Sequence, residues 1–176
     1  LEFRRVLFRS AWIENVIDYL DEPGEWCVNT KTRKIYYWPK NGTPSNNIQA
    51  PKLMELFRVE GKIQYDLPND IPARNINFKG LTFTKGDRSV WYKNRKGWAI
   101  QHDWDTFDYG NALLRFRGAE NCKVTECRFT NSGGSAMRLD LHAQNIEIKN
   151  NYIDYVGHMG ILLAGYGPGT KDVRSE

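Results

Sequence analysis

The chain has 176 residues, enough for one domain with a buried core. Aromatic residues make up 13% of the sequence and the mean hydropathy is low, which is typical of a loop-rich β protein rather than a helical bundle. No apolar run reaches the roughly 20 residues that a membrane-spanning helix needs. The three cysteines, Cys27, Cys122 and Cys127, are too few and too scattered for a disulfide framework, so we expect each to be buried as a small hydrophobic residue.

Both ends of the sequence look foreign to the protein. Residues 4–10, RRVLFRS, are what a widely used sequencing adaptor encodes in one reading frame, and residues 174–176, RSE, are what its reverse complement encodes. We therefore assign residues 1–10 and 174–176 to the adaptor and expect the chain to be an internal fragment. Without residues 4–10, which carry three arginines, and with Arg174 cancelling Glu176, the formal charge falls from +4 to +1. Charge then gives no reason to expect a nucleic-acid partner.

Residues 11–60 differ from the rest of the chain in their pattern of apolar and polar residues. AWIENVIDYL (11–20) carries apolar residues at helical spacing, and the following DEPG ends the pattern. GEWCVNTKTRKIYYWPK (24–40) predicts a hairpin, because two β-rich runs flank a polar turn. APKLMELFRVEG (50–61) fits a first, incomplete strand-turn unit. We expect this helix-plus-hairpin region to cap the open end of the repeats that follow, since no linker separates the two.

Three later segments align with one another without gaps, 24 residues apart. They are NALLRFRGAENCKVTECRFTNSGG (111–134), SAMRLDLHAQNIEIKNNYIDYVGH (135–158) and the shorter MGILLAGYGPG (159–169). NINFKGLTFT (75–84) fits the same pattern 46 residues before its counterpart. The alignment matches Ala112 with Ala136, Ala119 with Ala143, Asn121 with Asn145, Val124 with Ile148, Phe129 with Ile153, and Leu113 with Met137 and Ile161.

A unit of this length, built from short β runs and Gly/Asn turns, is one coil of a parallel β-helix. A coil cannot bury its inward side chains alone, but stacked coils form a continuous column. We expect Asn75, Asn121 and Asn145 to stack at a turn, because Asn tolerates the left-handed conformation and its amides bond from coil to coil. The predicted internal ladders are Ile76–Cys122–Ile146, Phe78–Val124–Ile148 and Phe83–Phe129–Ile153. The sequence thus predicts an all-β fold with coils over residues 61–173; a β-sandwich with coincidental spacing is the weaker alternative.

Residues 85–110 form an insertion in one coil. That coil is 46 residues long instead of 24, and insertions in a solenoid overhang one face, often the binding face. Acidic and aromatic side chains are concentrated in it: His102, Asp103, Trp104, Asp105, Phe107, Asp108 and Tyr109.

Strand AMRLDLH (136–142) alternates apolar and polar residues. If its apolar residues face the column, Arg138, Asp140 and His142 point outward together, with Arg138 and His142 flanking the carboxylate. A one-residue slip against the ungapped alignment brings Arg115 and Arg117 of the neighbouring coil within reach of Asp140. Tyr166 follows in the next coil.

This mixture of groups is typical of carbohydrate sites, where aromatic faces pack on sugars and two carboxyl groups cleave the glycosidic bond. We expect Asp140 to be one catalytic carboxyl group and Asp103, Asp105 or a residue after 173 the other. The expected substrate contacts are Arg138, His142, His102, Trp104, Asp108, Arg115, Arg117 and Tyr166. A surface row of ion pairs and solvated loop acids are alternatives, as is a Ca²⁺ site, although the spacing matches no known calcium loop.

The segments LDEPGEW, YYWPK, NALLRFRGAEN, RLDLHAQN and GILLAGYGPGTKDV together resemble right-handed parallel β-helix proteins of the pectin-lyase-like type. In particular they resemble glycoside hydrolase family 141, of the α-L-fucosidase and xylanase type. The resemblance implies an extracellular or periplasmic bacterial enzyme that acts on polysaccharide or oligosaccharide with paired acids, no cofactor and no membrane partner. It carries over Asp140 in RLDLH as a catalytic candidate. A polysaccharide lyase on the same scaffold and a non-catalytic glycan-binding protein are the competing functions; the oligomeric state is not indicated.

Overall fold

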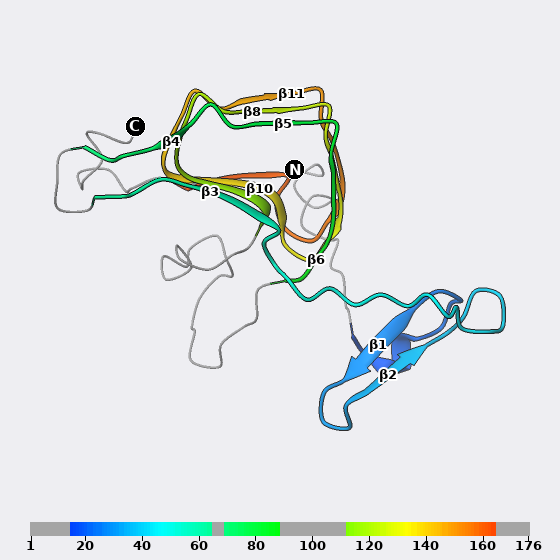
Figure 1. Ribbon diagram of the computed structural model, residues 1–176. Helices are drawn as coiled ribbons and strands as arrows, with labels where there is room; N and C mark the ends of the chain where they lie inside the picture. Colours follow the sequence, from blue (N-terminus) through cyan, green and yellow to red (C-terminus); the bar gives the residue numbers. More distant parts are fainter. Residues whose placement is uncertain (1–14, 65–68, 89–111, 165–176) are drawn as a thin grey trace, which may run out of the picture. The chain divides into compact units, whose positions relative to one another are not determined.

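The computed structural model describes residues 15–64, 69–88 and 112–164, and the chain divides into two compact units, residues 1–49 and 50–176 (Figure 1). The all-β prediction is confirmed, because the described residues contain thirteen strands and a single 3-10 turn, η1 (Ile17–Tyr19). No helix in these described ranges has the length and apolar character of a membrane span. The division into a cap of 11–60 and coils of 61–173 stays a prediction, although the structure assigns residues 50–60 to the second unit.

The first unit contains the predicted hairpin. Strands β1 (Trp26–Asn29) and β2 (Lys34–Tyr37) pair antiparallel, with Trp26 opposite Tyr37 and Asn29 opposite Lys34. The turn is closed by the Asn29 side chain, whose Oδ1 accepts the backbone N–H groups of Lys31 and Thr32 at 3.1 and 3.0 Å. This is the local side-chain bonding that makes Asn a turn former.

The helix predicted over residues 11–20 is wrong for residues 15–20, the part that the structure describes, because only Ile17–Tyr19 are helical. Asn15 has a left-handed backbone (φ 62°), and its side chain pairs with Val28, accepting the Val28 N–H at 2.6 Å and donating to its carbonyl at 3.0 Å. Val16 is extended, which leaves only the turn η1. A short helix needs packing on one face to persist, but Ile17 and Tyr19 are both more than half exposed.

The second unit consists of three parallel sheets to which each successive turn of the chain adds a strand (Figure 1). One sheet has the order β13-β10-β7-β3, with β4 also paired to β7; the others are β11-β8-β5 and β12-β9-β6. The strands are β3 (Phe57–Glu60), β4 (Ala73–Arg74), β5 (Asn77–Lys79), β6 (Thr82–Gly86), β7 (Ala112–Glu120), β8 (Lys123–Thr125), β9 (Arg128–Ser132), β10 (Ser135–Gln144), β11 (Glu147–Lys149), β12 (Tyr152–Val156) and β13 (Ile161–Ala164).

The 24- and 46-residue spacings are confirmed in two of the sheets and in part of the third. The observed register pairs Val124 with Phe78 and Ile148, pairs Phe129 with Phe83 and Ile153, and places Ala143 beside Ala119. The alignments of Ala112 with Ala136 and of Leu113 with Met137 are wrong, because Ser135 lies beside Ala112 and Met137 beside Leu114. Met137 does pair with Ile161, as predicted.

A bulge in β10 accounts for this one-residue difference. The register with β7 shifts between Asp140 and Ala143, and Leu141 within the bulge has a left-handed backbone with φ 56°. An extra residue in one strand of a pair produces this shift, and a bulky residue in the left-handed region is strained by about 1–3 kcal/mol. The predicted one-residue shift that brings Arg115 and Arg117 toward Asp140 is therefore confirmed for the residues before the bulge. After the bulge, the register returns to the ungapped 24-residue alignment.

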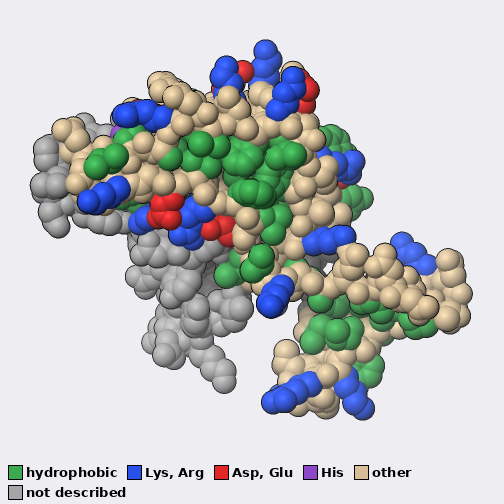
Figure 2. All heavy atoms as spheres, in the orientation of Figure 1, with side chains coloured by type: hydrophobic (Ala, Val, Ile, Leu, Met, Phe, Trp, Pro, Cys, Tyr) green, Lys and Arg blue, Asp and Glu red, His purple; other side chains and the backbone are tan. Residues whose placement is uncertain are grey.

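The core lies between the three sheets. Phe83 and Phe129 stack with ring centroids 4.7 Å apart and planes 3° apart, and Phe78 meets Phe83 edge-on at 6.0 Å. Val124 and Phe129 are fully buried, whereas Ile76, on the first turn, is 40% exposed and so only partly fulfils the predicted ladder. The space-filling view shows apolar side chains at the centre of the visible face of this unit, with charged groups around them (Figure 2). The cysteine prediction is confirmed, because all three are free and buried.

The asparagine ladder is confirmed at its turn. Asn75, Asn121 and Asn145 all have left-handed backbones, with φ of 61°, 54° and 53°. Asn145 Nδ2 donates to Asn121 Oδ1 at 3.2 Å, which joins two successive turns of the chain. These corners allow the chain to change direction at the same place in each turn.

Replacing Asn121 separates its backbone role from its side-chain role. We expect Asn121→Ala to lower the free energy of unfolding by about 1–2 kcal/mol, because alanine is strained at φ 54°. Asn121→Gly removes the same amide without the strain and should lose less. Urea denaturation of both variants checks this, and an equal loss for Gly and Ala would show that the amide bond alone matters.

Candidate functional site

Two rows of polar side chains cross the sheet formed by β3, β7 and β10. Register places Arg58 beside Arg115 beside Arg138 in the first row, and Glu60 beside Arg117 beside Asp140 in the second. Between the rows, Phe116 is buried in the core, with Val59 and Leu139 as its neighbours on the adjoining strands. Since successive side chains alternate between faces, both rows lie on the face opposite the core.

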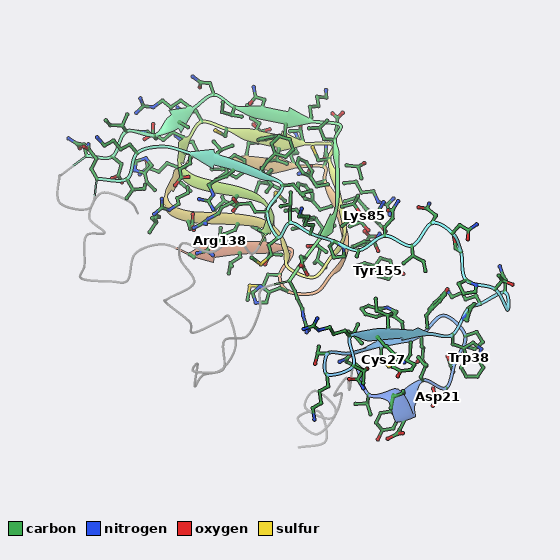
Figure 3. The ribbon with its side chains drawn as sticks, turned by 60° about the horizontal axis from the view of Figure 1, so that its bottom comes forward. Asp21, Cys27, Trp38, Lys85, Arg138 and Tyr155 are labelled. Carbon is green, nitrogen blue, oxygen red and sulfur yellow. The ribbon has the colours of Figure 1, made fainter. Side chains whose placement is uncertain are left out.

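Asp140 is held by two arginines through one of its two oxygens. Arg115 donates to Asp140 Oδ2 from Nε at 3.0 Å and from Nη2 at 2.5 Å, and Arg138 Nε lies 2.9 Å from the same oxygen. Asp140 Oδ1 is buried and has no hydrogen-bond partner among the described residues. We call Arg115, Arg138 and Asp140 the buried cluster; Figure 3 labels Arg138 on its strand.

The prediction that Arg138 and Asp140 project into solvent is wrong. Their side chains lie opposite the core as expected, yet Arg115, Arg138 and Asp140 are 0%, 2% and 1% exposed. Glu55 adds a second acid to the cluster, with Oε2 3.9 Å from Arg115 Nη1. Mutual pairing makes this burial tolerable, because an isolated buried charge costs far more than a paired one. The surface row of ion pairs that was the alternative reading is excluded for these residues by the same burial.

Burial sets the protonation of the cluster. It raises the pKa of Asp140 above its ordinary value, although the charges of Arg115, Arg138 and Arg117 act in the opposite direction. Burial likewise lowers the pKa of Arg138, assisted by the charge of Arg115 and opposed by that of Asp140. A carboxyl group with a raised pKa is suited to donating a proton near neutral pH.

Glu60 occupies a contrasting environment in the second row. It accepts hydrogen bonds from Arg117 Nη1 at 2.5 Å and from Arg58 Nη1 at 3.3 Å, while its side chain remains 36% exposed. Burial alone would raise the pKa of Glu60, but the bonds and charges of Arg117 and Arg58 outweigh it and hold the pKa below its ordinary value. Glu60 therefore carries its negative charge over a wider pH range than Asp140.

His142 does not flank Asp140, contrary to the prediction. The bulge carries it to the corner of the sheet, where its Nε2 lies 2.7 Å from Glu120 Oε1 and its Nδ1 lies 3.5 Å from Asp70 Oδ2. Glu120 also accepts from Arg74 Nε at 2.7 Å. We call Asp70, Arg74, Glu120 and His142 the corner cluster. The hydrogen bond from Arg74, followed by that from His142, lowers the pKa of Glu120 despite some desolvation.

The remaining predicted site residues lie outside the described part of the chain. These are His102, Asp103, Trp104, Asp105 and Asp108 of the insertion, and Tyr166. Their predicted roles, and the alternative of a Ca²⁺ site among them, stay predictions. Within the ranges that the structure describes, no group of three His, Cys, Asp or Glu side chains is arranged to hold a metal ion.

Glu55, Glu60, Asp70 and Glu120 were not predicted from the sequence. A signal for Glu60 exists in FRVE (57–60), whose alternation places Arg58 and Glu60 on one face of a strand. Nothing in the local sequence connects Asp70 with His142, because the two residues are 72 positions apart and the bulge redirects His142. These four acids come near the predicted residues only through the tertiary packing of the strands.

Comparison with known proteins gives one match. Residues 4–40 match the family model described as the GH141 insertion domain. The match supports a relationship to glycoside hydrolase family 141 and lies wholly within the first unit, so it does not extend to the residues of the buried cluster. It also includes residues 4–10, which the sequence analysis assigned to an adaptor. No curated protein and no solved structure matches the chain.

Removing one member of the buried cluster should be costly in a pH-dependent way. We expect Arg115→Met to lower the free energy of unfolding by about 3–5 kcal/mol at a pH above the pKa of Asp140, because it leaves a buried carboxylate with one cation fewer. The loss should shrink in acid. Protonated Asp140 needs no cation, so the penalty appears only as the pH rises through the pKa of Asp140.

Urea denaturation over a range of pH measures this dependence. Arg128→Met is the matched control, since Arg128 pairs with Asp154 at 3.1 Å but is 53% exposed. An exposed pair contributes about 0–1 kcal/mol, so this control should change little. A loss for Arg115→Met that is the same at every pH would contradict the electrostatic explanation.

Proposed function

We propose that the second unit is part of a right-handed parallel β-helix and that the chain belongs to a glycoside hydrolase that cleaves polysaccharide on the outer face of β7 and β10. The strand order supports the first part, since successive turns of the chain place β3, β7, β10 and β13 in one parallel sheet, β5, β8 and β11 in a second, and β6, β9 and β12 in a third. The match to the GH141 insertion domain supports the second, because it hints at a carbohydrate substrate. The proposal includes an extracellular or periplasmic location and hydrolysis without a cofactor.

The observation that carries the proposal is the asymmetric binding of the Asp140 carboxyl group. Oδ2 takes the ion pairs from Arg115 and Arg138, which fixes the plane of the group, while Oδ1 has no hydrogen-bond partner in the part of the chain that the structure describes. A proton on Oδ1 would then be the one for a glycosidic oxygen, and because Oδ1 is buried, a bound substrate has to displace the groups that cover it. Burial raises the pKa of Asp140, which favours this protonated form. A fixed, protonated carboxyl group is what a glycosidase needs as general acid.

The arginines of the same face favour one competing function, a polysaccharide lyase. Arg115, Arg117 and Arg138 lie together on β7 and β10, and a lyase uses such cations to neutralise a uronate. Lyases release an unsaturated sugar that absorbs ultraviolet light, whereas hydrolases release reducing sugar without this absorbance. Measuring both signals over a panel of neutral and acidic plant polysaccharides therefore separates the two reactions.

Substitution of Asp140 tests its assigned role. We expect Asp140→Asn to lower kcat by at least about 10²-fold, because the amide cannot donate the proton, while polysaccharide binding persists. Reducing-sugar assays and calorimetric titration with the same polysaccharide measure the two effects.

Asp154→Asn is the matched control. Asp154 is also paired with an arginine and also has a buried oxygen without a hydrogen-bond partner, but it lies on β12 in a different sheet. The Asp154→Asn variant should keep the activity of the unsubstituted protein. Full activity of Asp140→Asn, or no product from any polysaccharide in the panel, would overturn the hydrolase proposal, and binding without product would support a glycan-binding protein.

A further inference from the structure

We propose that Glu60 is the second catalytic carboxylate, acting as general base opposite Asp140, and that the reaction inverts the configuration of the anomeric carbon. This inference rests on the proposed hydrolase function and goes beyond it, because it names the partner of Asp140 and the stereochemical outcome. From the sequence alone, the expected partner was Asp103, Asp105 or a residue after 173.

The first support is the position of Glu60 in the sheet. Glu60 and Asp140 are both in register with Arg117, one on each neighbouring strand, and so lie on the same face. Strands are spaced about 4.8 Å apart, which separates the two backbones by about 10 Å. Inverting glycosidases hold their carboxyl groups roughly 6.5–9.5 Å apart, whereas retaining enzymes need about 5–5.5 Å. Flexible side chains on strands two apart can hold their carboxyl groups at the separation of inverting enzymes. The Arg117 side chain between them disfavours the shorter separation of retaining enzymes.

The second support is the difference between the two environments. The Glu60 side chain is 36% exposed, so water reaches it, whereas the Asp140 side chain is fully buried. Glu60 keeps its charge because Arg117 and Arg58 lower its pKa against the effect of desolvation. Asp140 has a raised pKa. Two acids whose surroundings push their pKa values in opposite directions are suited to act as a base and an acid at the same pH.

The other described acids fit the role of base less well. Glu55 binds Arg58 at 2.7 Å and approaches Arg115, the cation that already holds Asp140, so it belongs to the support of the acid. Glu120 and Asp70 are engaged with His142 in the corner cluster. Asp154 and Glu147 lie on β12 and β11, in the other two sheets.

The reaction balances with these two groups and one water molecule. Glu60 removes a proton from the water molecule as the water oxygen forms a bond to the anomeric carbon. The bond from that carbon to the glycosidic oxygen breaks on the opposite side, and the leaving oxygen takes the proton of Asp140. One proton enters Glu60 and one leaves Asp140, so exchange with solvent restores both groups.

The test combines product stereochemistry with two substitutions in the full chain. Proton NMR of the first sugar released by the unsubstituted protein should show the inverted anomer. Glu60→Gln should lower kcat by about 10²–10⁴-fold, with the same midpoint of thermal unfolding within a few degrees. Glu147→Gln is the matched control and should keep full activity, since Glu147 is an exposed glutamate paired with Lys123 at 2.9 Å.

The pH profile identifies each role. Activity falls in acid as Glu60 gains a proton and falls in alkali as Asp140 loses one, so Glu60→Gln should remove the acid limb. Asp140→Asn should remove the alkaline limb and should retain more activity on dinitrophenyl glycosides, whose leaving group needs no proton. If Glu60→Gln unfolds, Glu60→Asp replaces it; this variant keeps the charge, shortens the side chain and should lose at least about tenfold.

The outcomes separate the two proposals. A retained anomer, or Glu60→Gln within about threefold of full activity while Asp140→Asn is inactive, overturns the role of Glu60 and leaves the hydrolase proposal standing. Full activity of Asp140→Asn overturns both. Loss of activity in Glu60→Gln with an unchanged acid limb assigns Glu60 to structural support of Arg117 and also overturns the inference.

Discussion

The parallel register of successive turns is the constraint on which the rest of the second unit depends. Each turn adds one strand to each sheet, and the left-handed asparagines at positions 75, 121 and 145 set the corner at the same place every time. Because the register is fixed on the apolar face, it is also fixed on the opposite face. Arg58, Arg115 and Arg138 therefore form one row and Glu60, Arg117 and Asp140 the next. The candidate site is a consequence of core packing.

The buried cluster shows what this constraint costs and what it supplies. Burying two arginines and an aspartate on a sheet is unfavourable unless their charges compensate, and two cations on a single carboxylate oxygen provide that compensation. The same burial raises the pKa of Asp140, whereas Glu60, two strands away at the exposed end of the row, has its pKa lowered by Arg117 and Arg58. One row of one sheet thus contains two acids in opposite electrostatic conditions.

The bulge in β10 separates the buried cluster around Asp140 from the corner cluster around His142. Leu141 takes a left-handed backbone, the register moves by one residue, and His142 turns away from Asp140 toward Glu120 and Asp70. Bulges are common beside active sites, where they redirect a side chain. Without the bulge, strict alternation would place His142 two residues beyond Asp140 on the same face, which is the arrangement that the sequence alone suggested.

The sequence by itself determined the elements that depend on local chemistry and on repetition. The hairpin of 24–40, the asparagine corners, the pairs Val124–Ile148 and Phe129–Ile153, and the outward direction of Arg115 and Arg138 follow from turn formers and from the alternation of side chains along a strand. Only the tertiary structure decided that Asp140 is buried, that residues 15–20 contain a 3-10 turn in place of the predicted helix, and that Glu60 joins the row. Burial and ion pairing depend on which strands become neighbours, and the register of β3, β7 and β10 brings Glu60, Arg117 and Asp140 together although they lie 57 and 23 positions apart along the chain.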